Sequence, residues 1–320
     1  MRPPNLRHHT KAPILILIAL TLSSILVAQE PSPPPAKPAG PPVELSLIVT
    51  NSAKKSVDSI AKEDVRISED KVDQTVLSVE RDERPVDCVL AIDSTGSVRS
   101  MIPTVMESAR LVIVNRRPDD EILVERFVSS EKIESVQDFT RDEKALLVAL
   151  DKFYVERGQS AVIDALYVAA STFAKFNKTS KARRRVIVII SDGEDRRSFY
   201  KLDALIKMLR QTGVQVFALG LVIELDKQPF FVGKNPREKA EKLLETVTSE
   251  TGGRVFFPEN KSELFDSIQQ IITDLRGQFR LRYQATNTEK KGFRKVEVKL
   301  ISAAGEKPTA IVPRGYESKF

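Results

Sequence analysis

Acidic and hydroxyl side chains gather in three short segments of this 320-residue chain. Segments DSTGS (93–97) and SDGED (191–195) each directly follow an apolar run, and GQS (158–160) lies between them in sequence. Carboxylate and hydroxyl oxygens are the ligands that hard divalent cations prefer in proteins. The residue types therefore indicate a cation site on oxygen ligands, with Mg²⁺ as the expected ion and Mn²⁺ or Ca²⁺ as alternatives.

The first segment places three such oxygens close together. Asp93, Thr95 and Ser97 are spaced by two residues, and we expect Gly96 to permit the tight turn that makes their oxygens converge. One or two carboxylates with three hydroxyls supply fewer than three negative charges. A cation held in this way would stay open to one further carboxylate from outside the chain.

Histidine and cysteine are too scarce for most other kinds of catalytic or metal site. The two histidines, His8 and His9, precede a segment that we expect to be removed, and Cys88 is the single cysteine. These counts exclude Ser-His-Asp triads, Cys-His dyads and zinc sites on histidine or clustered cysteine. Neither a P-loop nor a G-x-G-x-x-G motif occurs. We expect Cys88, in an apolar run, to be a buried and unreactive thiol.

The net charge gives no indication of a nucleic-acid partner. The whole chain carries 50 basic and 44 acidic residues, but residues 1–28 contain three bases and no acid. The remaining chain is therefore close to +3, without the strong basic excess of nucleic-acid-binding domains. We expect no nucleic-acid partner, and no feature points to a small-molecule substrate or to a particular oligomeric state.

The N-terminus has the pattern of an export signal. Basic residues precede the uncharged apolar run Ile14–Val27, which is shorter than the roughly 20 residues of a membrane span. We expect a signal peptide over residues 1–28, cleaved near Ala28, although the large Leu26 leaves an uncleaved anchor as the alternative. Residues 29–42 are a proline-rich linker. The product would be periplasmic, secreted or attached to the cell surface.

Residues 85–277 alternate buried strands with helical segments. The near-continuous apolar runs VDCVLAID (86–93) and RVIVIIS (185–191) are typical of parallel strands covered on both faces. Helical patterns follow both runs, beginning with Val98–Val114 after the first. We therefore predict an α/β domain with a doubly wound, mostly parallel sheet, in which sites gather at the carboxyl ends of the strands.

Short alternating strands flank this domain on both sides. We predict an N-terminal β segment (43–84) and a C-terminal β segment (278–320), neither of which has enough strands to be stable alone. The two ends are expected to pair into one small β-sandwich beside the α/β domain.

The three polar segments resemble the metal-ion-dependent adhesion site of von Willebrand factor type A domains. In those domains the site consists of D-x-S-x-S, a later threonine and a later Asp-Gly, in the same order as the three segments of this chain. The resemblance implies a Rossmann-like fold and a cation held by Asp93, Thr95, Ser97, Ser160 and Asp192. The common pattern has serine where this chain has Thr95 and threonine where it has Ser160. Both residues keep the hydroxyl. Over residues 43–316 the chain also resembles the exported VWFA-related proteins described from Acidobacteria.

Three further acids lie near the implied ligands. Asp164, one helical turn after Ser160, and Glu194 and Asp195, beyond Asp192, could support the cation from a second layer. The alternative is structural, because Asp and Ser after a strand are common helix caps and Asp-Gly is a common turn.

Three functions are compatible with these residues. We favour a non-catalytic binding protein whose cation is completed by a carboxylate of a protein partner, as the family resemblance implies. The alternative is a structural component of an extracellular assembly, in which the cation only braces the loops. A metal-assisted hydrolase with Asp192 or Glu194 as base is the least favoured, because no group is visibly placed to move protons.

Overall fold

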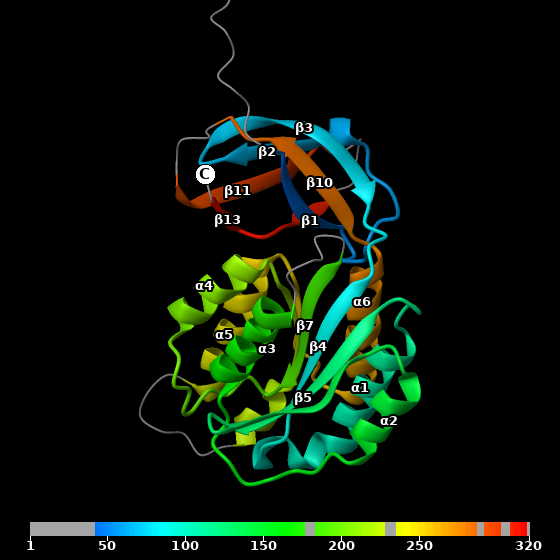
Figure 1. Ribbon diagram of the computed structural model, residues 1–320, viewed down its shortest axis with the longest axis vertical. Helices are drawn as coiled ribbons and strands as arrows, with labels where there is room; N and C mark the ends of the chain where they lie inside the picture. Colours follow the sequence, from blue (N-terminus) through cyan, green and yellow to red (C-terminus); the bar gives the residue numbers. More distant parts are fainter. Residues whose placement is uncertain (1–41, 177–182, 228–234, 287–290, 302–307, 319–320) are drawn as a thin grey trace, which may run out of the picture. The chain divides into compact units, whose positions relative to one another are not determined.

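Two β-sheets organise the protein in a computed structural model that describes residues 42–176, 183–227, 235–286, 291–301 and 308–318. A six-stranded sheet with helices on both faces forms the α/β region, and a seven-stranded antiparallel sheet is built from the two flanking segments (Figure 1). The predicted signal peptide and nearly all of the predicted linker lie outside the described residues. Within those residues, no helix is both long and apolar enough to cross a membrane.

The α/β region has the expected alternation of strands and helices. The strands are β4 (Val86–Asp93), β5 (Glu121–Ser129), β6 (Lys132–Thr140), β7 (Arg184–Ser191), β8 (Gln215–Gly220) and β9 (Val255–Phe256). The helices are α1 (Ile102–Val114), α2 (Glu143–Asp151), α3 (Val162–Phe176), α4 (Leu202–Thr212), α5 (Pro236–Thr251) and α6 (Lys261–Arg276), with 3₁₀ turns η2 (Gly96–Met101) and η3 (Val222–Lys227).

The sheet order is β6-β5-β4-β7-β8-β9, and all neighbours are parallel except β6, which pairs antiparallel with β5. Every residue of β4 is buried, because α1, α2 and α6 pack on one face of the sheet and α3, α4 and α5 on the other. The prediction of a doubly wound, mostly parallel sheet is confirmed. Cys88 is buried in β4, and burial raises the pKa of its thiol to about 12, so it is unreactive as expected.

The first helix begins later than the sequence pattern predicts. The predicted helix Val98–Val114 consists of the 3₁₀ turn η2 followed by α1. Pro103 stands in the first turn of α1, where its missing N–H costs no hydrogen bond, and so favours the start of the α-helix there.

The second sheet interleaves strands from the two ends of the chain. Its order is β12-β1-β10-β3-β2-β11-β13, so that C-terminal β10 lies between N-terminal β1 and β3. The bounds are β1 (Val43–Thr50), β2 (Val65–Glu69), β3 (Val72–Arg81), β10 (Phe279–Gln284), β11 (Gly292–Leu300), β12 (Thr309–Ile311) and β13 (Gly315–Ser318), with a 3₁₀ turn η1 (Lys62–Asp64) after β1.

The described residues form one curled sheet here, where the sequence analysis expects a sandwich of two sheets (Figure 1). Between Arg282 and Tyr283 of β10 the register shifts, so that Leu77 is an extra residue in the neighbouring β3. This bulge allows the sheet to coil, so that Leu47, Leu281 and Tyr283 lie in its own core. Strands β12 and β13 are not predicted from the sequence, because three or four residues are too few for an alternating pattern.

A buried polar cluster fastens the curled sheet. Glu69 on β2 accepts hydrogen bonds from Tyr283 at 2.6 Å and Tyr316 at 2.9 Å, and it pairs with Arg294 at 2.9 Å. Burial, followed by the hydrogen bond to Glu69, raises the pKa of Tyr283, which therefore keeps its proton. Because these side chains come from four strands, removing the carboxylate would leave a buried guanidinium and two hydroxyls without their acceptor.

A buried glutamate on β5 makes stability depend on pH. Glu125 Oε1 has no hydrogen-bond partner among the described residues, and burial raises the pKa of this carboxyl from 4.5 to about 8. The folded protein then holds a proton that the unfolded chain releases above pH 4.5, so this group contributes less stability as the pH rises toward 8. We expect Glu125→Gln to be more stable than the wild type at pH 8 by about 2–4 kcal/mol and to lose most of this pH dependence.

Urea denaturation at pH 5, 7 and 9 measures the effect, with the exposed Glu131→Gln as the matched control. If the free energy of unfolding changed with pH equally in the wild type and in Glu125→Gln, the raised pKa assigned to Glu125 would be contradicted.

Candidate functional site

The parallel pairing of β4 with β7 brings two of the three polar segments together. Ile92 lies opposite Ile190 in the register, so Asp93 and Ser191 end neighbouring strands at the same edge of the sheet. The Ser191 hydroxyl donates a hydrogen bond of 2.7 Å to Asp93 Oδ2. The carboxyl edge of the sheet is therefore where the predicted ligands collect, as expected for an open α/β sheet.

The segment after β4 folds back on its aspartate. The Thr95 backbone N–H and hydroxyl both donate to Asp93 Oδ1, at 2.9 and 2.7 Å, and Thr95 Oγ1 lies 2.8 Å from Ser97 Oγ. The three oxygens thus converge as predicted. The expected role of Gly96 is wrong, since its φ is not positive and a Cβ there would meet no atom within 4 Å.

The glycine that this site does require is Gly193. Its φ is +75°, and a Cβ there would lie 2.8 Å from Leu244 Cδ1. This residue turns the chain directly after Asp192, so a larger residue would displace the loop.

The other two segments complete the cluster. Ser160, before α3, points its hydroxyl at Asp93 Oδ2, at 3.4 Å. Asp192 Oδ1 accepts the backbone N–H of Glu194 at 2.9 Å, while its Oδ2 is buried without a hydrogen-bond partner among the described residues. Asp192 lies close enough to Asp93 for the two carboxylates to repel each other. All five predicted ligand residues are therefore brought to one place.

The two carboxylates of this cluster are buried and repel each other. Asp93 and Asp192 are 1% and 0% exposed. Burial, followed by the charge of Asp93, raises the pKa of Asp192 to about 7, and burial also raises the pKa of Asp93. A cation between these oxygens would relieve both the burial cost and the repulsion.

The donor set fits Mg²⁺ only if hydroxyls take part. In the described part of the chain, no group of three or more His, Cys, Asp or Glu side chains could hold a metal ion. Two carboxylates and the hydroxyls of Thr95, Ser97 and Ser160 would have to share the ion with water. The unpartnered Oδ2 of Asp192 supports this fit.

The cluster opens into a hollow of about 280 Å³. Besides predicted ligands, the hollow is lined by Arg157, Glu194 and Arg196. Arg157 is exposed, and Arg196 pairs with Glu194 at 2.8 Å. The sequence analysis missed both arginines, because neither belongs to a ligand pattern. Their only signal is position, next to Ser160 and Asp192 in the chain.

The three supporting acids have structural contacts. Asp164 binds the backbone N–H groups of Phe199 and Tyr200, at 2.7 and 2.8 Å, and the hydroxyl of Ser130. Asp195 accepts the N–H of Ile163 at 3.0 Å, in the first turn of α3. Glu194 lines the hollow and pairs with Arg196. Of the three, Glu194 alone borders the space in front of the ligands.

An aromatic side chain stands out on the loop that follows Asp192. Phe199 is 78% exposed and lies edge-on to Tyr200, which stacks on Tyr167 at 3.6 Å between ring centroids. Asp164 holds the backbone beneath both rings. The loop therefore presents a large apolar group on a fixed backbone, a frequent feature of protein-binding surfaces.

Comparison with known proteins gives one family match. The model of the von Willebrand factor type A domain matches residues 87–273, more than half of the chain. No protein of curated function matches the chain by sequence.

Several solved structures are similar to part of this chain. An aerotolerance-related membrane protein from Bacteroides fragilis has 21% identity and a TM-score of 0.43, covering 58% of this chain and 98% of its own. BatB from Bacteroides thetaiotaomicron has 17% identity and a TM-score of 0.46, covering 59% and 98%. Proximal thread matrix protein 1 from the mussel byssus has 14% identity and a TM-score of 0.47, covering 61% and 49%.

Repulsion between the two buried carboxylates predicts an unusual effect of substitution. In chelator-treated protein at pH 8, Asp192→Asn removes one of two like charges, so we expect the free energy of unfolding to rise by about 1 kcal/mol. Asp195→Ala, in the same loop, should lower it by about 1 kcal/mol, because Ile163 loses its acceptor. Urea denaturation measures both, and a destabilised Asp192→Asn would contradict the repulsion.

Proposed function

This chain belongs to the von Willebrand factor type A domain family, whose members commonly mediate protein interaction or adhesion, and we propose that it binds a protein partner through a divalent cation. The ion would be Mg²⁺, or alternatively Mn²⁺ or Ca²⁺, held by Asp93, Thr95, Ser97, Ser160 and Asp192. A carboxylate of the partner would complete its coordination. The cation supplies an electron-poor centre that attracts this carboxylate, and no bond is made or broken.

One observation carries the proposal. Asp93 and Asp192 are buried beside three hydroxyls, and Asp192 Oδ2 has no partner among the described residues. The hydrogen bonds to Asp93 leave two negative charges buried side by side, which is unfavourable, so the arrangement is explained best by a cation that these oxygens are shaped to hold.

The positive charge at the rim of the hollow is evidence for a partner with an acidic group. Arg157 is exposed there and forms no ion pair with a carboxylate of the described residues, while Arg196 is shared with Glu194. A partner carboxylate directed at the cation would pass this guanidinium, which would draw it in and favour acidic over basic partners. Phe199 offers an apolar contact on the following loop.

A structural role for the cation is the second candidate. Asp93 already receives hydrogen bonds from Thr95, Ser160 and Ser191, and so connects all three loops without any ligand from outside. In that case the ion would only brace the loops of a protein within an extracellular assembly. An enzymatic role has no comparable support, because no general base other than the carboxylates themselves lines the hollow among the described residues.

The proposed location is outside the cytoplasm. It rests on the basic and apolar pattern of residues 1–28 and on the proline-rich stretch that follows. The protein would be periplasmic, secreted or held at the cell surface, with an uncleaved N-terminal anchor as the alternative.

Calorimetric titration of Mg²⁺, Mn²⁺ and Ca²⁺ into the purified chain tests the cation site. We expect saturable binding of one ion, lost in the double variant Asp93→Ala, Asp192→Ala, because both charged ligands are then missing. The exposed pair Asp203→Ala, Glu107→Ala serves as the control with the same charge change. Binding that persists in the first double variant would contradict the assigned ligands.

Selection of peptides from a random library tests the proposed partner chemistry. Peptides retained in Mg²⁺ should contain Asp or Glu and should be released by chelator. Arg157→Glu should weaken them several-fold without changing Mg²⁺ affinity, whereas Lys207→Glu, on the exposed side of α4, should not. Peptides that stay bound in chelator would instead favour the structural role.

A further inference from the structure

The chain between α2 and α3 carries Ser160 but has no regular secondary structure. We call residues 153–160 the Ser160 segment; none of them belongs to a helix or a strand. The N–H of Glu156 donates to the carbonyl of Ser94 at 2.9 Å, and the carbonyl of Ser160 accepts the N–H of Arg196 at 2.9 Å. Because no ladder of main-chain hydrogen bonds fixes such a segment, side-chain contacts have to determine its path.

A buried arginine of β5 makes most of these contacts. Arg126 is 1% exposed, and its Nη2 pairs with Glu156 at 2.9 Å. Its Nε donates to the carbonyl of Tyr154 at 3.3 Å, and the ring of Tyr154 lies 4.0 Å from the guanidinium carbon. Its Nη1 pairs with Glu134 of β6 at 3.1 Å. All three nitrogens therefore have an acceptor, and two of these acceptors belong to the Ser160 segment.

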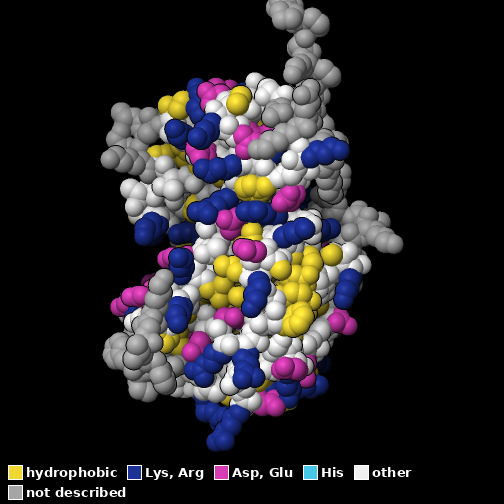
Figure 2. All heavy atoms as spheres, turned by 90° about the vertical axis from the view of Figure 1, so that its left-hand side faces the viewer, with side chains coloured by type: hydrophobic (Ala, Val, Ile, Leu, Met, Phe, Trp, Pro, Cys, Tyr) yellow, Lys and Arg dark blue, Asp and Glu magenta, His cyan; other side chains and the backbone are white. Residues whose placement is uncertain are grey.

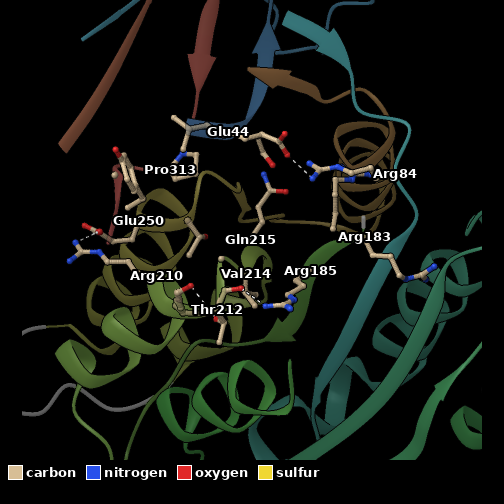
Figure 3. A pocket seen from close by; sticks show the side chains of 18 residues that line it. Glu44, Arg84, Arg183, Arg185, Arg210, Thr212, Val214, Gln215, Glu250 and Pro313 are labelled. Atoms are coloured by element: carbon tan, nitrogen blue, oxygen red, sulfur yellow. Dashed lines mark hydrogen bonds and ion pairs between the residues drawn. The ribbon is translucent and has the colours of Figure 1, made fainter. Parts of the chain in front are cut away.

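Arg126 differs from the arginines that gather elsewhere in the molecule. Figure 2 shows Lys and Arg side chains in a band across the middle of one face, exposed to solvent. A hollow of about 310 Å³ between the two sheets has five arginines in its lining (Figure 3). Four of them are half-buried, and the fifth, Arg184, is buried with two nitrogens that have no partner among the described residues. A guanidinium that is both buried and fully paired, as in Arg126, holds its partners in one geometry.

Two further contacts direct the Ser160 segment. Lys132 of β6 pairs with Glu156 at 2.6 Å, so this carboxylate is bound between two cationic side chains. Gly158 passes so close to β5 that a Cβ there would lie 2.6 Å from the carbonyl oxygen of Val128. The segment is therefore fastened at Glu156 and lies against β5 at Gly158, two residues before Ser160.

This attachment lies next to the first loop of the cation site. Phe127, the next residue of β5, stands opposite Asp93 in the register. The carbonyl of Phe127 accepts the N–H of Ser94, and the carbonyl of Ser94 accepts the N–H of Glu156, both at 2.9 Å. A displacement at Glu156 would therefore shift the hydroxyl of Ser160 relative to Asp93, which it faces at 3.4 Å.

We propose that Arg126 is a positioning residue of the cation site, which holds Ser160 in place through Glu156 and Tyr154. This inference rests on the proposed function, since Arg126 itself would touch neither the cation nor the partner. The charge of Arg126 would repel a cation, so electrostatics alone predicts tighter cation binding when this charge is removed. Positioning predicts weaker binding, and the two effects therefore have opposite signs.

Calorimetric titration of Mg²⁺ into the full chain and into Arg126→Met measures this sign. We expect Arg126→Met to bind Mg²⁺ about tenfold more weakly, because Ser160 loses its support. The control Arg116→Met removes a half-buried arginine that pairs with Glu143 at the start of α2, and it should bind Mg²⁺ like the wild type. Near-ultraviolet circular dichroism checks that both variants are folded. Equal or tighter Mg²⁺ binding by Arg126→Met would overturn the proposal.

Gly158→Ala tests the same path without a change of charge. Its Cβ would collide with Val128 and displace the Ser160 segment, so Mg²⁺ should bind several-fold more weakly. This variant decides the question if Arg126→Met does not fold. Undiminished affinity in Gly158→Ala would show that the path of the segment does not matter to the ion, and would overturn the proposal.

Hydrogen–deuterium exchange of the metal-free protein separates this inference from the proposed function. Residues 153–160 should exchange several-fold faster in Arg126→Met than in the wild type, whereas β8 should not change. Unchanged exchange in the Ser160 segment would overturn the positioning role, even with weaker Mg²⁺ binding. A wild type that binds no Mg²⁺ would contradict the proposed function, and faster exchange in Arg126→Met would then still support Arg126 as the residue that positions Ser160.

Discussion

The parallel pairing of β4 with β7 is the constraint that places the charged groups at both ends of these strands. These two strands lie at the centre of the six-stranded sheet and are buried between helices on both faces, so their register cannot shift without exposing the core. At their carboxyl ends the register sets Asp93 beside Ser191, and at their amino ends it sets Val86 beside Arg184. Apolar packing therefore determines where charge is concentrated at each edge of the sheet.

The two edges concentrate charge of opposite sign. Carboxylates with hydroxyls gather at one edge and guanidinium groups at the other. In each place a buried group keeps unused hydrogen-bonding capacity, Oδ2 of Asp192 at the first and Nε and Nη1 of Arg184 at the second. Such groups oppose folding, and the large apolar core of the α/β region supplies the stability that tolerates them. The unused oxygen of Asp192, in a well-packed core, is the physical argument for the proposed cation.

Much of the α/β fold could be predicted from the sequence, because β4 and β7 are apolar on both faces and each ends at a polar loop. The five candidate ligands could be predicted for the same reason, since strand ends bring residues 93, 160 and 192 together. The side-chain contacts of Asp164 could not, because helical spacing places it near Ser160 whereas its carboxylate turns to the backbone of Phe199 and Tyr200. The hollow between the two sheets could not be predicted either, because residues from Glu44 to Tyr316 line it and no local pattern links them. The coiling of the second sheet could not be predicted, because the alternation of apolar and polar residues identifies strands but not how the sheet that they form coils.

The interleaving of the chain ends imposes an order of folding. Strand β1 pairs with β10 and β12, and β3 pairs with β2 and β10. The N-terminal strands therefore lack most of their partners until residues 279–311 are available. The α/β region lies wholly between them in sequence and can form first, which shortens the loop that β1 and β10 must close. Until then, β1 and β3 present unpaired edges to any other chain nearby. A newly made molecule is therefore most exposed to aggregation just before β10 to β12 have been synthesised, and truncation before these strands removes the partners of β1 and β3.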